Sequence, residues 1–391
     1  MTFSLSKIIN LDPPTFVPDA VIVGAGVIGL SIAWRLSQKG MRVVIVDPKP
    51  LGGASWVAAG MLAPVSEANP GEEELVRLGL KSLQRYPSFV KELEDFSQME
   101  VGYISSGTLE VGLDANDRAE IEFLHSFRSK LGLETKLLDS TATRKVEPSL
   151  SPGIQASVSI EQEHQVDNRL LCQALLKAVY LGGGYFYQAT IAELKFDEKK
   201  PLKTLVAENG IKISSPNIVI AAGAWSGDIK GIIPQLPIYP IKGQTLRVRL
   251  PESYLGYQKI IRGLAKGYHV YMVPRKHGEI IIGATVEDKG FDTTITVEGI
   301  YELLRNITSL LPNISEATIE ETLAGLRPGS PNNAPILGSF ATQGLFVATG
   351  HYRNGILLTP VTSDALSDCV IDQVDPAYIE YFSPNRFLKD A

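Results

Sequence analysis

The sequence has 391 residues, of which 44% are hydrophobic and 20% charged, as in a globular protein large enough for two domains. A net charge of −6, a pI of about 5.6 and the lack of a basic run argue against nucleic acid as the main partner. Two widely spaced cysteines, Cys172 and Cys369, and no apolar stretch long enough to cross a bilayer predict a cytoplasmic protein with reduced thiols and no membrane contact.

The chain begins with an extension and one strand–helix–strand unit. Residues 1–18 contain three prolines and predict an irregular N-terminal extension. Residues 19–23 predict a strand that runs through a glycine turn into a helix, which ends at Gly40, and a second strand ends at Asp47.

The later segments change character twice, which predicts two domains assembled from separated pieces. Helical spacing of apolar residues is found at 72–95 (broken by Pro87), 117–131, 170–184 and 298–311. Strands of the apolar type, expected in a parallel sheet buried on both faces, are predicted at 185–194 and 213–226, and further strands at 101–113, 151–159 and 345–349. Alternating segments at 241–250 and 268–285 predict antiparallel strands with one exposed face.

A dinucleotide-binding motif lies in the first unit. Gly24, Gly26 and Gly29 form GxGxxG between strand and helix, where they allow the tight turn, the approach of a pyrophosphate and the packing of helix on strand. The start of the helix offers free N–H groups to the phosphates, and Asp47 can accept from ribose hydroxyls. A glycine-rich turn without a ligand is the simpler alternative, but the strand, the helix and the acid together favour a dinucleotide.

Two further segments favour FAD over NAD. GGASWVAAGM follows the first unit and would let the backbone approach a long ligand, and LFVATGHYRNGILL is a second strand-to-helix junction. A second helix N-terminus directed at the flavin pyrimidine would stabilise the negative charge left by reduction. The cofactor-binding residues that we expect are Gly24, Gly26, Val27, Ile28, Gly29, Asp47, Pro48, Ala54, Ser55, Ala59, Gly60, Met61, Ile191, Ala222, Gly223, Trp225, Gly350, His351, Tyr352, Arg353, Asn354, Gly355, Ile356 and Leu357.

The predicted fold class is therefore α/β, with a Rossmann-like FAD-binding domain and a second, substrate domain on an antiparallel sheet. We expect residues 19–98, 152–232 and 324–391 in the FAD-binding domain and residues 99–151 and 233–323 in the substrate domain.

These segments resemble the D-amino-acid oxidase superfamily of flavin-dependent amine oxidases, and within it the glycine oxidases of the thiamine pathway. The resemblance covers nearly the whole chain beyond residue 19, and its motifs are VIVGAGVIGLSIAWRL, AAGML, AAGAWS, YHVYMVPR, AGLRPG and GHYRNGILLTP. It implies noncovalent FAD, O2 as electron acceptor, a homotetramer and a thiazole synthase as partner. It also implies that glycine, sarcosine and small D-amino acids such as D-alanine are oxidised by hydride transfer to flavin N5.

The resemblance also implies roles for individual residues. Arg327 in AGLRPG matches the carboxylate-binding arginine, Tyr271 in YHVYMVPR the tyrosine at the substrate, and Arg353 the arginine beside flavin and substrate. The expected catalytic residues are Tyr271, Arg327 and Arg353, and the expected substrate-binding residues are the same three with His269 and Met61. Val286 stands where some members have methionine, which affects pocket volume.

Several alternatives stay open on sequence alone. Arg327 could cap strand carbonyls, Tyr271 could be a plain core residue, and His269 could be a hydrogen-bonded packing residue instead of a group behind the substrate-binding residues or a base. A D-amino-acid dehydrogenase using another acceptor, or a noncatalytic FAD-binding subunit, are the competing functions, and an NAD-dependent dehydrogenase is a more distant one. The five histidines predict no metal site, and Glu161 and Glu163 are expected in a solvated loop.

Arg353 raises a question of its own, because it stands in an otherwise apolar junction and a buried guanidinium requires an anionic or hydrogen-bonding partner. We expect backbone or flavin oxygens and the substrate carboxylate to supply it.

Overall fold

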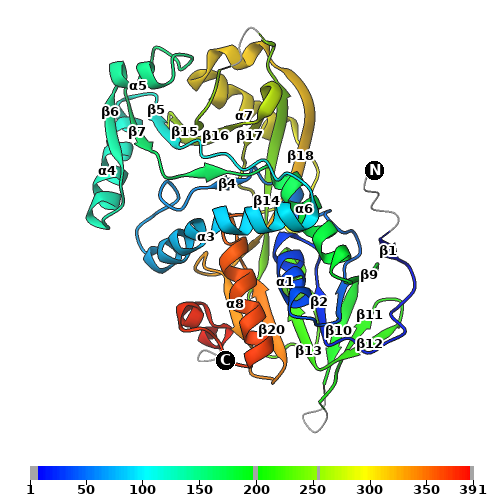
Figure 1. Ribbon diagram of the computed structural model, residues 1–391. Coiled ribbons are helices and arrows are strands. Elements are labelled where there is room, and N and C mark those ends of the chain that lie inside the picture. The colour runs from blue at the N-terminus through cyan, green and yellow to red at the C-terminus, as the bar shows by residue number, and fades with distance from the viewer. Residues whose placement is uncertain (1–7, 197–200, 253–255, 388–391) are drawn as a thin grey trace.

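The computed structural model of the protein describes residues 8–196, 201–252 and 256–387 (Figure 1). Two large sheets divide these residues into two parts. The first is a seven-stranded sheet, parallel except at one edge, whose strands in spatial order are β1 (Ile9–Asn10), β9 (Tyr185–Tyr187), β3 (Val43–Val46), β2 (Ala20–Val23), β13 (Asn217–Ile220), β20 (Leu345–Thr349) and the antiparallel β19 (Ile336–Ser339).

This first sheet is buried on both faces, as its uninterrupted apolar strands require. One face packs against helices, which are α1 (Val27–Gln38), α3 (Glu73–Ser97), α6 (Asn168–Leu181) and α8 (Thr359–Asp372). The other face packs against a three-stranded antiparallel sheet of β10 (Ile191–Lys195), β11 (Lys203–Ala207) and β12 (Lys212–Ser215). Alternate residues of one strand serve the two faces, since Ile22 lies in the helix-side core and Val23 in the other.

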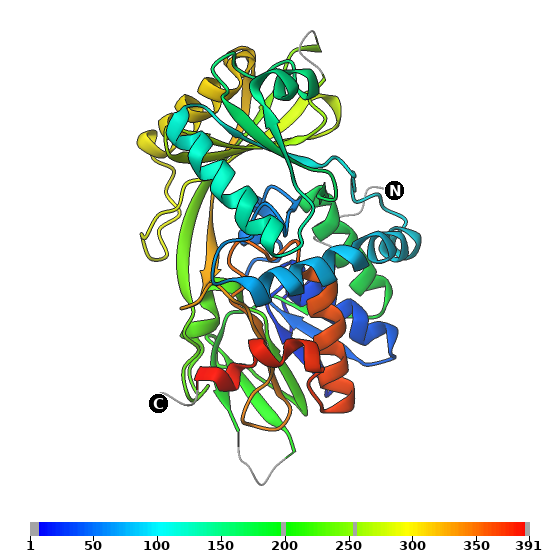
Figure 2. The same cartoon turned by 90° about the vertical axis from the view of Figure 1, so that its left-hand side faces the viewer.

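The second part is an eight-stranded mixed sheet that lies above the first in Figures 1 and 2. Its strands in order are β18 (Thr318–Gly329), β14 (Tyr239–Arg249), β17 (Glu279–Gly283), β16 (Tyr268–Pro274), β15 (Ile260–Ala265), β5 (Thr108–Gly112), β7 (Ala156–Ile160) and β6 (Lys136–Asp139). Helices α4 (Ala115–Lys130), α5 (Ser140–Val146) and α7 (Val297–Leu310) belong to this part. The short helix α2 (Ala54–Val57) contacts both α6 and β18, and β4 (Met61–Leu62) and β8 (His164–Gln165) form a separate two-stranded antiparallel sheet. The long strands β14 and β18 run from this part toward the first (Figure 1).

Four expectations about local structure require correction. Helix α3 continues through Pro87, because its buried face, including Tyr86 and Phe89, packs on the core and outweighs the lost backbone bond. Strand β10 is antiparallel within the small sheet, although it was expected in the parallel one. The extension is not wholly irregular, since β1 pairs with β9. Strand β7 lies in the eight-stranded sheet, although its residues fall within the range expected for the FAD-binding domain.

Within the described residues, no helix is both long enough and apolar enough to cross a bilayer. Cys172 and Cys369 are buried and unbridged, as expected for reduced thiols.

Candidate active site

The glycine loop between β2 and α1 has the geometry that the motif predicts. Gly24 has a φ of +112°, and a methyl group on it would overlap the backbone of Ala221, directly after the neighbouring strand β13. A methyl group on Gly29 would overlap the carbonyl oxygen of Gly24, so helix and loop can approach only without one. A methyl group on Gly26 would approach only the Ser55 hydroxyl, at 3.3 Å, so this side of the loop is open.

The loop presents backbone donors as a phosphate site requires. Asp47 at the end of β3 accepts from the N–H groups of Ala25 and Lys49, both at 2.7 Å, and its burial raises the pKa of its carboxyl group. The Ser55 hydroxyl accepts from Val27 at 3.0 Å. Among the described residues the N–H groups of Ile28 and Gly29 have no acceptor. These orphan donors at the start of a twelve-residue helix fit the pyrophosphate of a dinucleotide.

The small-residue segment 53–61 lies against the same loop. Asn168 of α6 donates to the carbonyl groups of Ser55 and Trp56, at 2.9 and 3.0 Å, and so anchors the segment to α6. Gly60 has a φ of +76°, and a side chain there would overlap the Val166 carbonyl oxygen. Met61 packs on a small cluster of Ala59, Ile260, Val273 and Ile281, which also contacts Tyr271. The segment therefore joins the nucleotide loop to the second sheet.

The second junction, residues 350–357, forms a turn before α8. Gly350 and Tyr352 have φ values of +72° and +47°, and the Tyr352 N–H donates to Pro328 at 3.0 Å, directly after Arg327 in β18. The Ile356 and Leu357 carbonyl groups accept from Tyr86 and Ser82 of α3, at 2.6 and 2.7 Å. This turn therefore carries Arg353 to the end of the strand that carries Arg327.

Two side chains of the second sheet lie flat across glycines of neighbouring strands. Tyr271 of β16 lies over Gly283 of β17, and the guanidinium of Arg327 in β18 lies over Gly243 of β14. In both cases a methyl group on the glycine would overlap the functional end of the side chain. Burial raises the pKa of Tyr271, an effect that nearby Arg327 opposes, so the phenol stays protonated at neutral pH. Strand pairing and alternation place both side chains on the same face of the sheet, and Arg327 is close enough to act on the charge of Tyr271.

Arg327 is oriented by backbone acceptors. Its Nη1 donates to the carbonyl oxygen of Thr285 at 3.0 Å and more weakly to that of Lys242 at 3.4 Å. Both hydrogens of Nη1 are used in this way, and among the described residues Nε and Nη2 have no acceptor, so they form a two-donor edge. That edge matches the two oxygens of a carboxylate.

The partner of Arg353 is a carboxylate of the protein. Its Nε lies 2.9 Å from Oε2 of Glu67, and Glu67 also forms an ion pair with Arg262 of β15. Burial alone would raise the pKa of Glu67, but Arg262 and Arg353 outweigh it and lower the pKa to about 2. Glu72 lies 3.9 Å from Nη2 of Arg353. The structure thus adds an ionised carboxylate, absent from our expectation, between two arginines.

Glu67 and Arg262 were missed by sequence reasoning. Neither belongs to a motif, and they are 195 residues apart. Arg262 pairs across the strands with Tyr271, and alternation along a strand could have indicated that it shares a sheet face with this residue. Glu163 was wrongly expected in a solvated loop. It is fully buried, accepts from the N–H groups of Val65 and Ser66 at 2.9 and 2.6 Å, and so anchors the segment that carries Glu67.

Some expected site residues lie at the rim or in the core. His269 has a side chain 72% exposed, with Nε2 3.9 Å from Glu120, and therefore we leave it out of the proposed site. Trp225 stacks on Phe291 at 5.8 Å, and Val286 is also exposed. Ile191 is a core residue of β10, and His351 is buried beside Thr362 with its pKa lowered to about 3 by burial. The remaining expected cofactor residues lie after β3, along the segments 53–61 and 350–357, or after β13, and they are Pro48, Ala54, Ala222, Gly223, Asn354 and Gly355.

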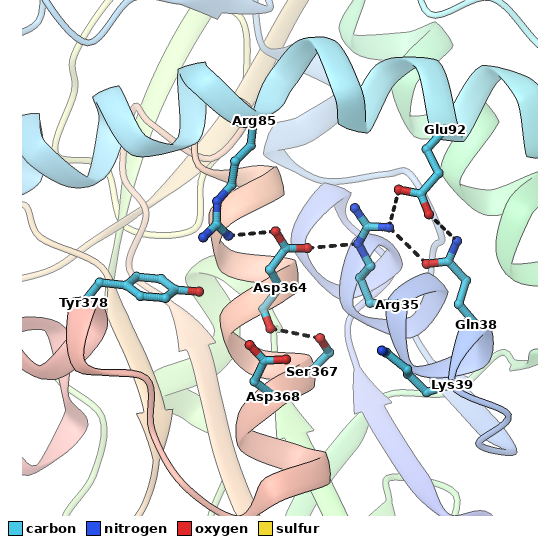
Figure 3. Close-up of a pocket in the computed structure, with 9 residues that line it drawn as sticks. All are labelled: Arg35, Gln38, Lys39, Arg85, Glu92, Asp364, Ser367, Asp368 and Tyr378. Atoms are coloured by element: carbon cyan, nitrogen blue, oxygen red, sulfur yellow. Dashed lines mark hydrogen bonds and ion pairs between the residues drawn. The ribbon is translucent and has the colours of Figure 1, made fainter.

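A cavity of about 570 Å³ on the outer helices is not this site (Figure 3). Its charged residues neutralise one another, since Asp364 pairs with Arg35 and Arg85, and Arg35 also pairs with Glu92. Neither Arg327 nor the glycine loop lines it. Among the described residues, no cluster of three or more His, Cys, Asp or Glu side chains could hold a metal ion.

Comparison with known proteins agrees with this geometry. The family model described as DAO, FAD dependent oxidoreductase, matches residues 19–369. The chain belongs to this family. Its cofactor is therefore FAD, for which the open glycine loop and the orphan donors of α1 provide a fitting site.

Named relatives cover most of the chain. It is 33% identical over 373 residues to the bifunctional protein ThiO/ThiG of Trichormus variabilis, covering 95% of this chain and 56% of that one, so it spans about half the length of that relative. It is 30% identical to the glycine oxidase of Geobacillus kaustophilus, covering 90% and 92% of the two chains. It is 29% identical to the hydrogen cyanide synthase subunit HcnC of Pseudomonas aeruginosa, covering 94% and 96%. The crystal structure of the Geobacillus glycine oxidase superposes with a TM-score of 0.88, covering 95% of this chain and 99% of that one.

Proposed function

We propose that this flavoprotein oxidatively deaminates glycine and small amines such as sarcosine and D-alanine. The observation that carries the proposal is the Nε–Nη2 edge of Arg327, which has no acceptor among the described residues, close to the protonated Tyr271. Similarity to glycine oxidases over about nine-tenths of the chain supports the same substrate class.

In this proposal the residues bind and orient the substrate. Arg327 takes the carboxylate with Nε and Nη2, and the Tyr271 hydroxyl donates to the same carboxylate, which fixes the position of Cα. The FAD, when bound, supplies the acceptor for the hydride that leaves Cα. The net reaction converts glycine, O2 and water into glyoxylate, ammonia and hydrogen peroxide, by way of the imine.

No side chain is required as the general base. Glu67 is ionised but is held by two arginines, which makes it a poor proton acceptor. His269 is exposed at the rim. We therefore propose that water takes the proton that the substrate ammonium group loses. Arg353 and Glu67 would form an ion pair that sets the local charge beside the substrate carboxylate.

The wider role is part of the same proposal. FAD is bound without a covalent link, since both cysteines are buried in α6 and α8. The imine serves thiamine thiazole synthesis with a thiazole synthase as partner, as the likeness to ThiO/ThiG suggests. We further propose a cytoplasmic homotetramer.

A competing proposal is an enzyme that passes electrons to an acceptor other than O2, or a noncatalytic FAD-binding subunit. The similarity to HcnC, a hydrogen cyanide synthase subunit, supports testing these alternatives alongside the oxidase. Purified yellow protein is mixed with glycine, sarcosine or D-alanine in air, and hydrogen peroxide is measured. Peroxide formed with glycine supports the oxidase. Flavin that glycine reduces without peroxide supports another acceptor, and flavin that no amine reduces contradicts both enzymes.

A further inference from the structure

The sheet face opposite Arg327 carries a buried ion pair. Lys242 of β14 has a fully buried side chain, and its Nζ lies 3.3 Å from Oε2 of Glu287 and 3.9 Å from Oδ2 of Asp292. Among the described residues, Glu287 is therefore its nearest compensating charge. A lysine buried in this way without an anion would be strongly unfavourable.

Glu287 is also bonded to the segment that follows β17. Its Oε1 accepts from the hydroxyl of Thr285 at 2.6 Å and from the side-chain amide of Gln244 at 2.8 Å. Burial would raise the pKa of Glu287, but these donors and Lys242 lower it, so the carboxylate is ionised at neutral pH. Gln244 in turn bonds Thr296, the N-cap of α7, at 2.9 and 3.0 Å.

The backbone connects this network to Arg327. Lys242 and Glu287 exchange two N–H···O bonds of 3.0 Å, and the Gln244 N–H donates to the Thr285 hydroxyl at 2.8 Å. The two carbonyl oxygens that accept from Nη1 of Arg327 belong to Lys242 and Thr285. Both residues that orient the guanidinium are thus members of the network on the opposite face.

We propose that Glu287 and Lys242 are positioning residues for the substrate carboxylate, which act by fixing the two carbonyl groups that turn the Nε–Nη2 edge of Arg327 toward the ligand. The inference rests on the proposed role of Arg327. It gives Glu287 a function although it does not touch the substrate. Relaxation of the 285–287 segment would let the guanidinium rotate and lose the two-donor geometry.

The test uses Glu287→Gln, which keeps an oxygen for Thr285 and Gln244 and removes the charge that faces Lys242. Binding of acetate to the FAD-loaded protein is followed by the change in flavin absorbance, and glycine kinetics are measured alongside. We expect the Kd for acetate and the KM for glycine to rise about 10-fold, with kcat and FAD content changed less than about 2-fold. Asp288→Asn, which removes an exposed carboxylate from the same loop, is the matched control and leaves the Kd for acetate unchanged.

Two further variants separate positioning from folding. In an Arg327→Ala background, Glu287→Gln should cause no additional loss of acetate binding. The double variant Lys242→Met/Glu287→Gln carries no buried charge, so it folds even where Glu287→Gln does not, and its acetate affinity should still be weakened. Wild-type acetate affinity in a folded Glu287→Gln or double variant, or an equal loss in the Arg327→Ala background, overturns the proposal. Acetate binding needs no turnover. A protein that binds acetate through Arg327 but does not oxidise glycine would therefore refute the proposed oxidase function and leave the positioning role of Glu287 and Lys242 standing.

Discussion

The nucleotide loop and the substrate side are built in different ways. The loop at Gly24–Gly29 is a single stretch of chain in which backbone shape and backbone N–H groups do the binding. The substrate side combines Glu67, Arg262, Tyr271, Arg327 and Arg353, which come from separate segments and lie over glycines or in ion pairs. A site formed by backbone groups of one segment is encoded locally, whereas a site formed by side chains of several segments depends on strand pairing.

The largest effect is expected in the loop. Gly29→Ala places a methyl group against the Gly24 carbonyl oxygen, and relief requires the helix to move off the strand. We expect the FAD content of the purified protein to fall below about a tenth of the wild-type value, measured by visible absorbance. Gly153→Ala is the matched control, because it lies away from the loop and the added carbon meets only side-chain atoms of Leu113 and Ser151, at 3.3 and 3.6 Å. Full FAD content in Gly29→Ala would show that the close approach is dispensable.

Loss of the two-donor edge of Arg327 should reduce activity toward glycine without loss of FAD. Arg327→Lys keeps the positive charge but removes the parallel pair of donors, and kcat/KM for glycine should fall about 100-fold while FAD stays bound. Arg249→Lys is the control, since this arginine is exposed on β14 and pairs with Glu320. An unchanged KM in Arg327→Lys would mean that the carboxylate is held elsewhere.

The glycines beneath the side chains offer a sharper test. A methyl group in Gly243→Ala meets the flexible end of Arg327, so the sheet can persist while the guanidinium is displaced. We expect kcat/KM to fall about 10- to 100-fold with little change in Tm. In an Arg327→Ala background the same change should have almost no further effect. A loss that is equally large in that background would place the defect in the sheet itself.

The ion pair of Arg353 with Glu67 should contribute less to kcat/KM for glycine than the two-donor edge of Arg327. Arg353→Ala removes one of the arginines that lower the pKa of Glu67, so this pKa should rise from about 2 toward its ordinary value. We expect kcat/KM for glycine to fall about 10-fold. Glu67→Gln provides a double-mutant cycle, in which losses smaller than additive would reveal the coupling. If Arg353→Ala had the kinetics and the FAD content of the wild type, this role for Arg353 would be ruled out.

The smallest effect concerns stability in mild acid. Burial lowers the pKa of His351 to about 3, so the folded state holds it neutral while the unfolded chain takes up a proton below about pH 6.5. Stability contributed by the neutral ring is therefore lost as the pH falls from about 6.5 toward 3. The Tm of the wild type should drop a few degrees more between pH 7 and 5 than that of His351→Gln. Parallel Tm curves would contradict this account.

The outcome of sequence-based prediction follows the same division. The glycine roles, the βαβ unit and the contiguous turn at 350–357 could be predicted, because each depends on neighbouring residues. The contact between Glu67 and Arg262 could not, since it spans 195 residues, and the place of Arg262 beside Tyr271 requires the pairing of β15 with β16. The helix through Pro87 shows the converse case, in which core packing on α3 outweighs a local signal that predicts a break.

The proposal as a whole depends on whether a small amino acid delivers electrons to the flavin through this site. The most direct measurement is anaerobic titration of the FAD-loaded protein with glycine, with acetate as the ligand that shares the carboxylate but has no amine. We predict that glycine bleaches the flavin absorbance and that acetate only perturbs it, with both effects weakened in Arg327→Lys. A flavin that no concentration of glycine, sarcosine or D-alanine bleaches would contradict the proposed reaction.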